Sequence, residues 1–256
     1  MKELVIEDIK KRYNNILALK GVSFGLSQGE VVGFLGPNGA GKSTMLKILI
    51  GLLKPDKGNV FYNSIDILKN PNEIKSVLGY VPEKNDIYNH MTGFEYLLFV
   101  GRLRGLNDRR IKIKAERLLS LIGLENDMHL SIDTYSKGMR QKVLITSALL
   151  HNPEIILLDE PFSGLDVTSV FVVIEIIKRL ASDGKIIIYA SHILDMIEKL
   201  CSRVIIIKKG EILADDNIDN LKRLTNMVSL EQVFKKIVET ENTEKIADDF
   251  VKELYL

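Results

Sequence analysis

Short runs of branched apolar residues recur along the chain and predict buried strands. The runs are Leu4 to Ile9, Val31 to Leu35, Val77 to Val81, Ile155 to Leu158, Ile186 to Tyr189 and Val204 to Ile207. Helical segments lie between several of these runs. Short apolar strands that alternate with helices are typical of a largely parallel sheet covered on both faces. The pattern therefore predicts an α/β fold.

The segment from about Phe94 to Leu150 interrupts this alternation, because it is mostly helical and holds no convincing buried strand. We interpret it as an inserted helical lobe. Residues 1–215 are expected to form one domain that contains this lobe at about residues 85–152, and residues 216–256 a C-terminal helical extension.

Two amphipathic helices are predicted in that extension. The first has its apolar stripe at Leu230, Val233, Phe234, Ile237 and Val238, and the second repeats apolar residues every four positions at Ile246, Phe250 and Leu254. An apolar stripe at helical spacing needs a surface to cover it. Docking on the main domain and docking on a partner both satisfy that need.

Composition limits the class of protein. The chain has 256 residues, of which 46% are hydrophobic and 27% charged, so it is long enough for one large domain with a real core. The formal net charge of +1 argues against an extended nucleic-acid surface. A local basic run, Arg102 to Lys114, is interpreted as either a solvated helix face or a binding patch.

Cysteine content and hydropathy suggest where the protein works. Cys201 is the only cysteine, so no intrachain disulfide can form, as expected of a cytosolic protein. Residues Met1 to Lys11 are too charged for a secretory signal. No window approaches the roughly 18 apolar residues of a membrane span. Any membrane role is therefore expected to come through a partner.

One segment carries a strong chemical motif, Gly36-Pro37-Asn38-Gly39-Ala40-Gly41-Lys42-Ser43-Thr44. It follows a predicted strand and opens into a predicted helix. Glycines allow successive N–H groups to face one anion, and the helix N-terminus adds its positive dipole. The spacing is that of a phosphate-binding loop, in which Lys42 reaches the β- and γ-phosphates and the Ser43 hydroxyl ligates Mg²⁺. A flexible turn without a ligand is the alternative.

A second part of the same site is predicted at Asp159 and Glu160, two carboxylates that follow the apolar strand Ile155 to Leu158. In a parallel sheet, the carboxyl ends of strands meet the ligand. Asp159 is expected to hold Mg²⁺ through its water shell, which leaves Glu160 as a general base for an attacking water. Taken alone, the pair could be a solvated strand end. Beside a phosphate loop, it favours a nucleotide hydrolase or a phosphotransferase.

The remaining motifs follow an order that resembles the ATP-binding cassette (ABC) ATPases over nearly the whole chain. Tyr135-Ser136-Lys137-Gly138-Met139-Arg140-Gln141 is similar to the ABC signature, usually Leu-Ser-Gly-Gly-Gln, with matches at Ser136 and Gly138. A Ser at a helix start with a bare Gly backbone suits a γ-phosphate, although an ordinary N-cap has the same residues.

The resemblance implies the P-loop NTPase fold, with a parallel sheet core, an antiparallel β edge, the helical subdomain and a helical tail. It also implies that Ser136 and Gly138 face the phosphate loop of a second, oppositely oriented subunit, so that a dimer, expected to be a homodimer, encloses two ATP molecules. A monomer would then be an incomplete enzyme. Ser163 to Asp166 resembles the loop that contacts the opposite subunit.

Three further site residues are implied by the resemblance. His192, after Ser191, resembles the switch histidine that touches the γ-phosphate and orients the water; an isolated His in such a place is usually a surface residue. Tyr13, in the polar connection expected after the first strand, stacks on adenine or is a half-buried packing residue. Glu83 replaces the usual Gln as an Mg²⁺ ligand and adds a negative charge.

These observations predict the ATP-hydrolysing subunit of an ABC transporter, with ATP and Mg²⁺ as ligands. Its implied partners are a second ATPase subunit and a polytopic membrane permease, which holds it at the cytoplasmic face of the membrane. Ser229 to Phe234 resembles a tail element of drug-type and antibiotic-type exporters. The alternatives are a soluble ABC-type regulatory or mechanical ATPase, and a phosphate-loop kinase, which leaves the signature and histidine motifs without a role.

Overall fold

The computed structural model describes residues 2–84, 87–238, 250, 251 and 254. A six-stranded sheet with the order β10-β9-β3-β8-β7-β6 forms its centre. Its strands are β3 (Val31–Leu35), β6 (Leu78–Val81), β7 (Ile155–Asp159), β8 (Ile186–Ala190), β9 (Arg203–Lys208) and β10 (Glu211–Asn217). All neighbours pair in parallel except β9 and the edge strand β10, which are antiparallel. The predicted α/β fold with a largely parallel core is confirmed.

A separate antiparallel sheet has the strand order β2-β1-β4-β5. It contains β1 (Glu3–Tyr13), β2 (Ile16–Ser27), β4 (Lys57–Tyr62) and β5 (Ile65–Asp66). Two predictions are corrected here. The run Leu4 to Ile9 is a strand of this second sheet rather than of the parallel one, and Tyr13 ends β1 rather than lying in a connection after it. The tight turn at Asn14 and Asn15 extends the β1–β2 hairpin further than the polar residues suggest.

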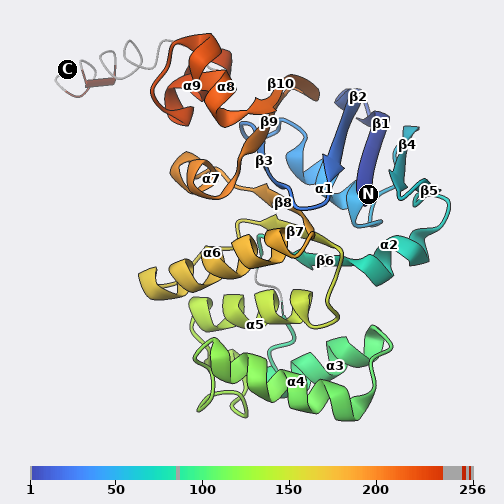
Figure 1. Cartoon of the computed structure of the whole chain (residues 1–256), viewed down its shortest axis with the longest axis vertical. Coiled ribbons are helices and arrows are strands. Elements are labelled where there is room, and N and C mark those ends of the chain that lie inside the picture. Colours follow the sequence, from blue (N-terminus) through green and yellow to red (C-terminus); the bar gives the residue numbers. More distant parts are fainter. Residues whose placement is uncertain (1, 85–86, 239–249, 252–253, 255–256) are drawn as a thin grey trace.

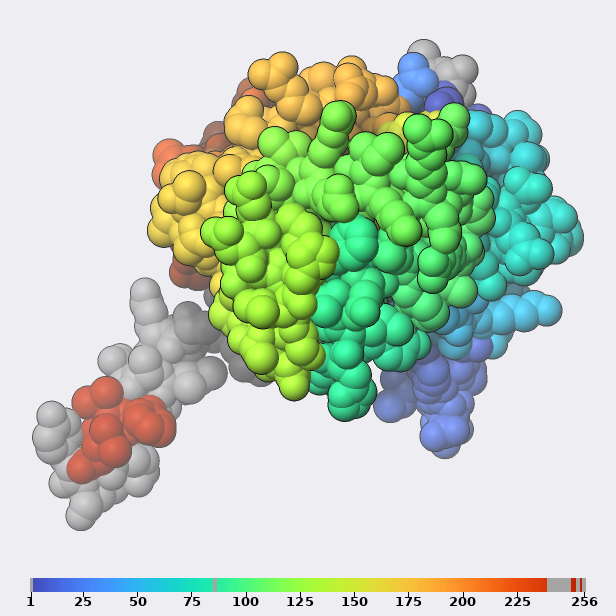
Figure 2. Space-filling model, turned by 90° about the horizontal axis from the view of Figure 1, so that it is seen from below, coloured from blue at the N-terminus to red at the C-terminus, as the bar shows by residue number. Residues whose placement is uncertain are grey.

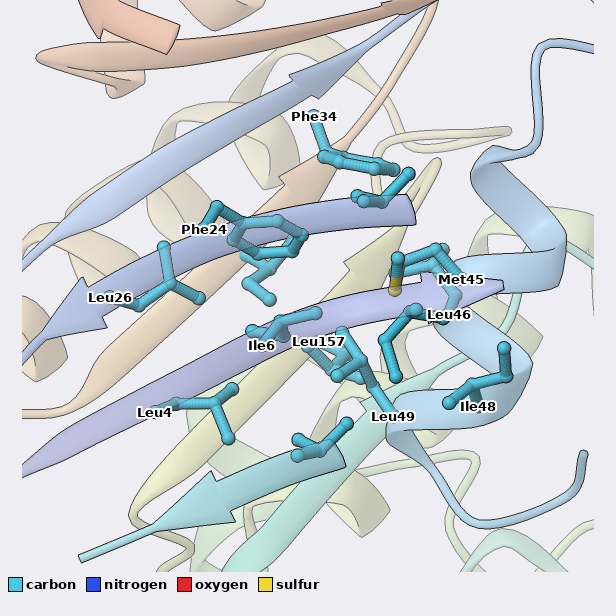
Figure 3. Close-up of a cluster of buried hydrophobic side chains, with 14 of the residues drawn as sticks. Leu4, Ile6, Phe24, Leu26, Phe34, Met45, Leu46, Ile48, Leu49 and Leu157 are labelled. Atoms are coloured by element: carbon cyan, nitrogen blue, oxygen red, sulfur yellow. The ribbon is translucent and has the colours of Figure 1, made fainter. Parts of the chain in front are cut away.

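Alternating side chains of the central sheet bury both of its faces. On one face, Leu157 packs with the antiparallel sheet and with α1 (Lys42–Leu49) in the cluster drawn in Figure 3. On the other face, Leu158 and Tyr189 pack with α5 (Lys137–Leu149) and α6 (Val167–Ser182). This two-sided burial explains why the parallel strands are continuous apolar runs.

The region between β6 and β7 is helical and forms the lower end of the molecule (Figures 1 and 2). It contains α3 (Gly93–Leu103), α4 (Asp108–Leu121), η1 (Ile132–Thr134) and α5. The helix α2 (Pro71–Val77) precedes β6. In the basic run, Arg102 pairs with Asp108 at 2.8 Å and the Lys114 Nζ donates to the Leu150 carbonyl. These two cations therefore make contacts within the helical region.

The C-terminal helices pack against the far end of the sheet. They are α7 (Leu194–Leu200), α8 (Ile218–Thr225) and α9 (Leu230–Val238). Leu230 and Val233 are fully buried against the same core as α7, so the first predicted tail helix docks on the main domain. Of the second stripe, Ile246 lies outside the described residues, whereas Phe250 and Leu254 are described and exposed.

No helix within the described ranges combines the length and the apolar character that crossing a membrane requires.

Candidate active site

The phosphate-loop motif forms the turn between β3 and α1, and its glycines stand where side chains do not fit. A Cβ on Gly41, whose φ is 113°, would lie 2.8 Å from the Ala18 carbonyl oxygen. A Cβ on Gly36 would lie 2.3 Å from the Ile207 carbonyl oxygen. Gly41 is the N-cap of α1 and offers no capping side chain, so the first N–H groups of the helix are left for another acceptor. Such a helix start is an anion site.

Lys42 lies at the start of α1 and its side chain turns back over the loop. Its Nζ donates to the carbonyl oxygens of Gly36 and Pro37, the second at 3.2 Å. Partial burial lowers the pKa of Lys42, while the carboxylates of Asp159 and Glu160 act in the opposite direction. The ammonium therefore sits among acceptors that an anionic ligand can replace.

A cavity of about 260 Å³ brings most of the predicted site together. It is lined by Tyr13, Ala18, Pro37, Asn38, Gly39, Ala40, Gly41, Lys42, Ser43, Thr44, Glu83, Asp159, Glu160 and His192. Gly36 lies behind the loop against β9, and Ser136 and Gly138 lie outside this cavity. Tyr13 is 44% exposed at the rim of this cavity, so it is accessible to a ligand.

Asp159 ends β7 inside the cavity. Burial first, and then the neighbouring charges of Glu83 and Glu160, raise the pKa of Asp159 to about 6. A carboxylate in such surroundings gains from a cation. The described residues contain no group of three or more His, Cys, Asp or Glu that could hold a metal by themselves. Ser43, Asp159 and Glu83 fit a magnesium ion that also takes phosphate oxygens and waters, because Mg²⁺ uses few protein carboxylates.

Glu160 is held by the residues that follow β8. Its carboxylate accepts hydrogen bonds from the Ser191 hydroxyl at 2.8 Å and from the backbone N–H of His192 at 2.7 Å, and it lies 2.6 Å from the His192 Nδ1. The Glu160 backbone has a φ of 49°, a left-handed conformation that is unfavourable for this side chain. The Glu160 side chain is 17% exposed and the His192 side chain 79%, so the pair connects the interior with the surface.

The signature-like segment forms a second candidate anion site, at the start of α5. The Ser136 hydroxyl accepts a hydrogen bond from the Met139 N–H at 3.2 Å, so Ser136 caps the helix, and it is exposed. A Cβ on Gly138 would lie 2.5 Å from the Gly164 carbonyl oxygen, which explains the glycine. Among the described residues, Ser136 and Gly138 do not line the cavity of the phosphate loop, whereas Lys137 lines a neighbouring cavity with Glu160 and His192.

Two residues of this region were not singled out from the sequence. Ser191 binds Glu160 directly, and its place next to His192 was the available signal. Gln141, buried in α5, donates to the carbonyl of Pro161, which follows Glu160. Nothing in the local sequence marks that contact, because the two residues belong to different elements.

Comparison with known proteins agrees with this geometry. Residues 19–163 match the family model described as ABC transporter. The chain is 38% identical to the ABC transporter ATP-binding protein NatA of Bacillus subtilis, over 90% of this chain and 96% of that protein. It is 39% identical to the linearmycin resistance ATP-binding protein LnrL of the same organism, over 82% of this chain and 68% of that protein.

Solved structures give the same result. A structure described as the ATP-binding subunit of an ABC transporter superposes with a TM-score of 0.85 at 30% identity, over 91% of this chain and 98% of that one. The ATP-binding cassette MJ0796, in a dimeric post-hydrolysis state bound to ADP and Pi, superposes with a TM-score of 0.76 at 27% identity, over 84% and 98%. The chain therefore belongs to the ABC transporter family, as one of its ATP-binding, ATP-hydrolysing subunits.

Proposed function

We propose that the protein is the ATPase subunit of an ABC exporter and that it hydrolyses ATP in a dimer that encloses two nucleotides. The observation that carries this proposal is the cavity in which a phosphate loop, Asp159, Glu160 and His192 meet. The separation of Ser136 and Gly138 from that cavity supports a site completed by a second subunit. A related cassette, MJ0796, forms a dimer in its own structure.

Each residue of the cavity has a proposed role in this reaction. The loop N–H groups and Lys42 bind the phosphates, and Tyr13 stacks on the adenine. Bound Mg²⁺, held by Ser43, Asp159 and Glu83, would neutralise phosphate charge. Because an ionised carboxylate only accepts hydrogen bonds, the 2.6 Å contact places the proton of His192 on Nδ1.

Glu160 is the proposed general base, which takes a proton from the attacking water. Its three contacts with Ser191 and His192 fix the carboxylate before the water arrives. The water is expected to lie in line with the γ-phosphate held on Lys42. His192 then completes the site as a positioning group on the exposed side.

The helical region between β6 and β7, about residues 85–152, is the proposed contact with a polytopic permease at the cytoplasmic face of the membrane. Its surface exposes the large apolar side chains of Tyr88 and Leu103, by 59% and 70%, and Tyr88 stacks edge-on against Phe99. An exposed aromatic cluster is a frequent feature of protein interfaces. Export as the direction is supported by the relative LnrL, which is named for linearmycin resistance.

The test is Glu160→Gln, which keeps the shape of the side chain and removes the base. Phosphate release in the absence of any acceptor is expected to fall by about 10²- to 10⁴-fold, while ATP binding and an ATP-dependent dimer persist. Glu175→Gln serves as the matched control, because it removes the charge of an exposed glutamate on α6 and should leave turnover unchanged. Undiminished phosphate release by Glu160→Gln would contradict the proposal.

A further inference from the structure

Gln141 lies in α5, the helix that Ser136 caps, but it points away from the exposed end. Only 1% of Gln141 is exposed. Its Nε2 donates a hydrogen bond of 2.9 Å to the carbonyl oxygen of Pro161, which is also buried. The side chain therefore crosses from the signature helix to the loop that leaves the end of β7.

The acceptor of this bond is directly connected to the proposed base. Pro161 follows Glu160, whose backbone is in the left-handed region with a φ of 49°. The Glu160 N–H donates to the Ala190 carbonyl at 3.0 Å, and the Ser163 N–H donates to the Glu160 carbonyl. Because a strained backbone persists only where its surroundings determine it, a bond to the next carbonyl is one of the contacts that set where the Glu160 carboxylate points.

A second contact joins the same two elements near the exposed end of α5. The Gly138 backbone packs so closely against Gly164 that a Cβ would lie 2.5 Å from the Gly164 carbonyl oxygen. Gly138 and Gln141 thus rest on the two ends of one short loop, residues 161–164. A shift of α5 is expected to move this loop, because the Gly138–Gly164 contact has no free space to absorb the shift.

In the described part of the chain, only the Nε2 group of the Gln141 amide makes a hydrogen bond. Its Oε1 is buried and has no hydrogen-bond partner within the residues that the structure describes. An unpaired buried acceptor is unfavourable, and an apolar side chain of similar size would fill the space without that penalty. Packing alone therefore does not explain a glutamine here, whereas the bond to Pro161 does.

We infer that Gln141 is a positioning residue that couples the two nucleotide sites of the dimer. Phosphate of the partner's nucleotide engages Ser136 and Gly138 at the start of α5, and the Gln141–Pro161 hydrogen bond passes the resulting position of α5 to Glu160 in the chain's own site. The inference rests on the proposed function, because it needs both a composite site and Glu160 as the base.

The test compares Gln141→Met with Thr146→Val in the full-length chain. Gln141→Met keeps the volume and removes the donor to Pro161. Thr146→Val removes another buried side-chain hydrogen bond from α5, one that returns to the Lys142 carbonyl within the helix. For Gln141→Met we expect kcat to fall about tenfold and the Hill coefficient for ATP to approach one, with KM and ATP binding within about twofold of wild type. Thr146→Val should change neither kcat nor the Hill coefficient.

A glutamate at the same position gives a pH-dependent rescue. Burial keeps Gln141→Glu partly protonated at low pH, and the protonated form donates to the Pro161 carbonyl, whereas the ionised form repels it. The ratio of its kcat to that of wild type is expected to rise as the pH falls from about 8.5 to about 6. A ratio that is constant with pH would oppose the inference.

Hydrogen exchange provides a measurement that does not depend on turnover. The Ser163 amide, bonded to the Glu160 carbonyl, should exchange about tenfold faster in Gln141→Met and at the wild-type rate in Thr146→Val. Equal exchange and equal kinetics of Gln141→Met and wild type would overturn the coupling role while leaving Glu160-dependent hydrolysis intact. If instead Glu160→Gln, made in the chain that keeps Gln141, hydrolysed ATP at the wild-type rate, the proposed function itself would be contradicted.

Discussion

Two places in the chain are candidate phosphate sites, and they differ in how many of the surrounding residues one chain supplies. The loop from Gly36 to Thr44 opens into a cavity with Lys42, Asp159 and Glu160 around it. Ser136, at the start of α5, is exposed and does not line that cavity in the part of the chain that the structure describes. The first is a cavity, called the cradle below, and the second is an exposed surface.

Charge separates the two places as well. Carboxylates crowd the cradle, so that the pKa of Asp159 is raised to about 6 by burial and by its acidic neighbours. Asp166, the N-cap of α6, instead has its pKa lowered, chiefly by hydrogen bonds from Ser169. The carboxylates around the first cavity repel one another, and a bound cation would relieve that repulsion, whereas the Asp166 carboxylate already accepts hydrogen bonds from Ser169. We therefore expect the cavity of the phosphate loop to supply most of the affinity for ATP, and the start of α5 to act mainly in dimerisation.

The largest effect should follow from Lys42→Ala, which removes the ammonium from the cradle. Charge-assisted hydrogen bonds to phosphate are among the strongest polar contacts, so ATP affinity is expected to fall about 100-fold or more. Fluorescent-nucleotide titration of the monomeric chain measures it. Lys47→Ala removes the same charge from the exposed side of α1 and should leave affinity within about twofold. Unchanged ATP affinity in Lys42→Ala would show that the cradle does not bind the phosphates through this ammonium.

A smaller and different effect is expected at Ser136, where Asp and Asn both preserve the cap of α5. Ser136→Asp adds a negative charge facing the partner's phosphates, so ATP-dependent dimerisation should weaken about tenfold while ATP binding by the monomer is retained. Ser136→Asn is the neutral control and should dimerise within about threefold of wild type. Sedimentation in the Glu160→Gln background distinguishes these outcomes. Equal dimerisation by the Asp and Asn variants would mean that Ser136 does not face phosphate.

The sequence predicted which residues gather around the Gly36–Thr44 loop, because most of them belong to two local segments. Gly36 to Thr44 is contiguous, and Asp159 ends and Glu160 follows a strand that is apolar on both faces. All six apolar runs contain strands, although Val77 ends α2, and the five runs of the central sheet are strongly apolar because that sheet is buried on both faces. The half-exposed strands β2, β4 and β10 were missed because their alternation is diluted by charged and polar residues.

Contacts between distant elements could not be predicted in this way. The placement of Leu4 to Ile9 in a second sheet depends on pairing with β2 and β4, which no local pattern specifies. Tyr13 was expected in a loop because polar residues surround it, yet hairpin pairing carries β1 to that residue. The bonds of Ser191 to Glu160 and of Gln141 to Pro161 join residues 31 and 20 positions apart. Such contacts follow from the fold rather than from a motif.

The smallest effect concerns stability without nucleotide, and it is expected to have opposite signs at Asp159 and at Asp166. The folded-state pKa of Asp159 is raised from 3.8 to about 6, so the stability due to its neutral form is present at low pH and lost as the pH rises through about 6. At pH 7.5, Asp159→Asn should therefore increase the free energy of unfolding by about 1–2 kcal/mol, a value reduced from the full shift because solvent screens part of the interaction. Asp166→Asn should decrease it slightly at the same pH, because a lowered pKa contributes stability above the unfolded value and loses it on acidification. Urea unfolding at pH 7.5 and pH 4 measures both variants, and the two differences from wild type should shrink toward the lower pH. A destabilised Asp159→Asn at pH 7.5 would show that the cradle is not strained by its own charges, and the contrast between the two phosphate sites would then rest on geometry alone.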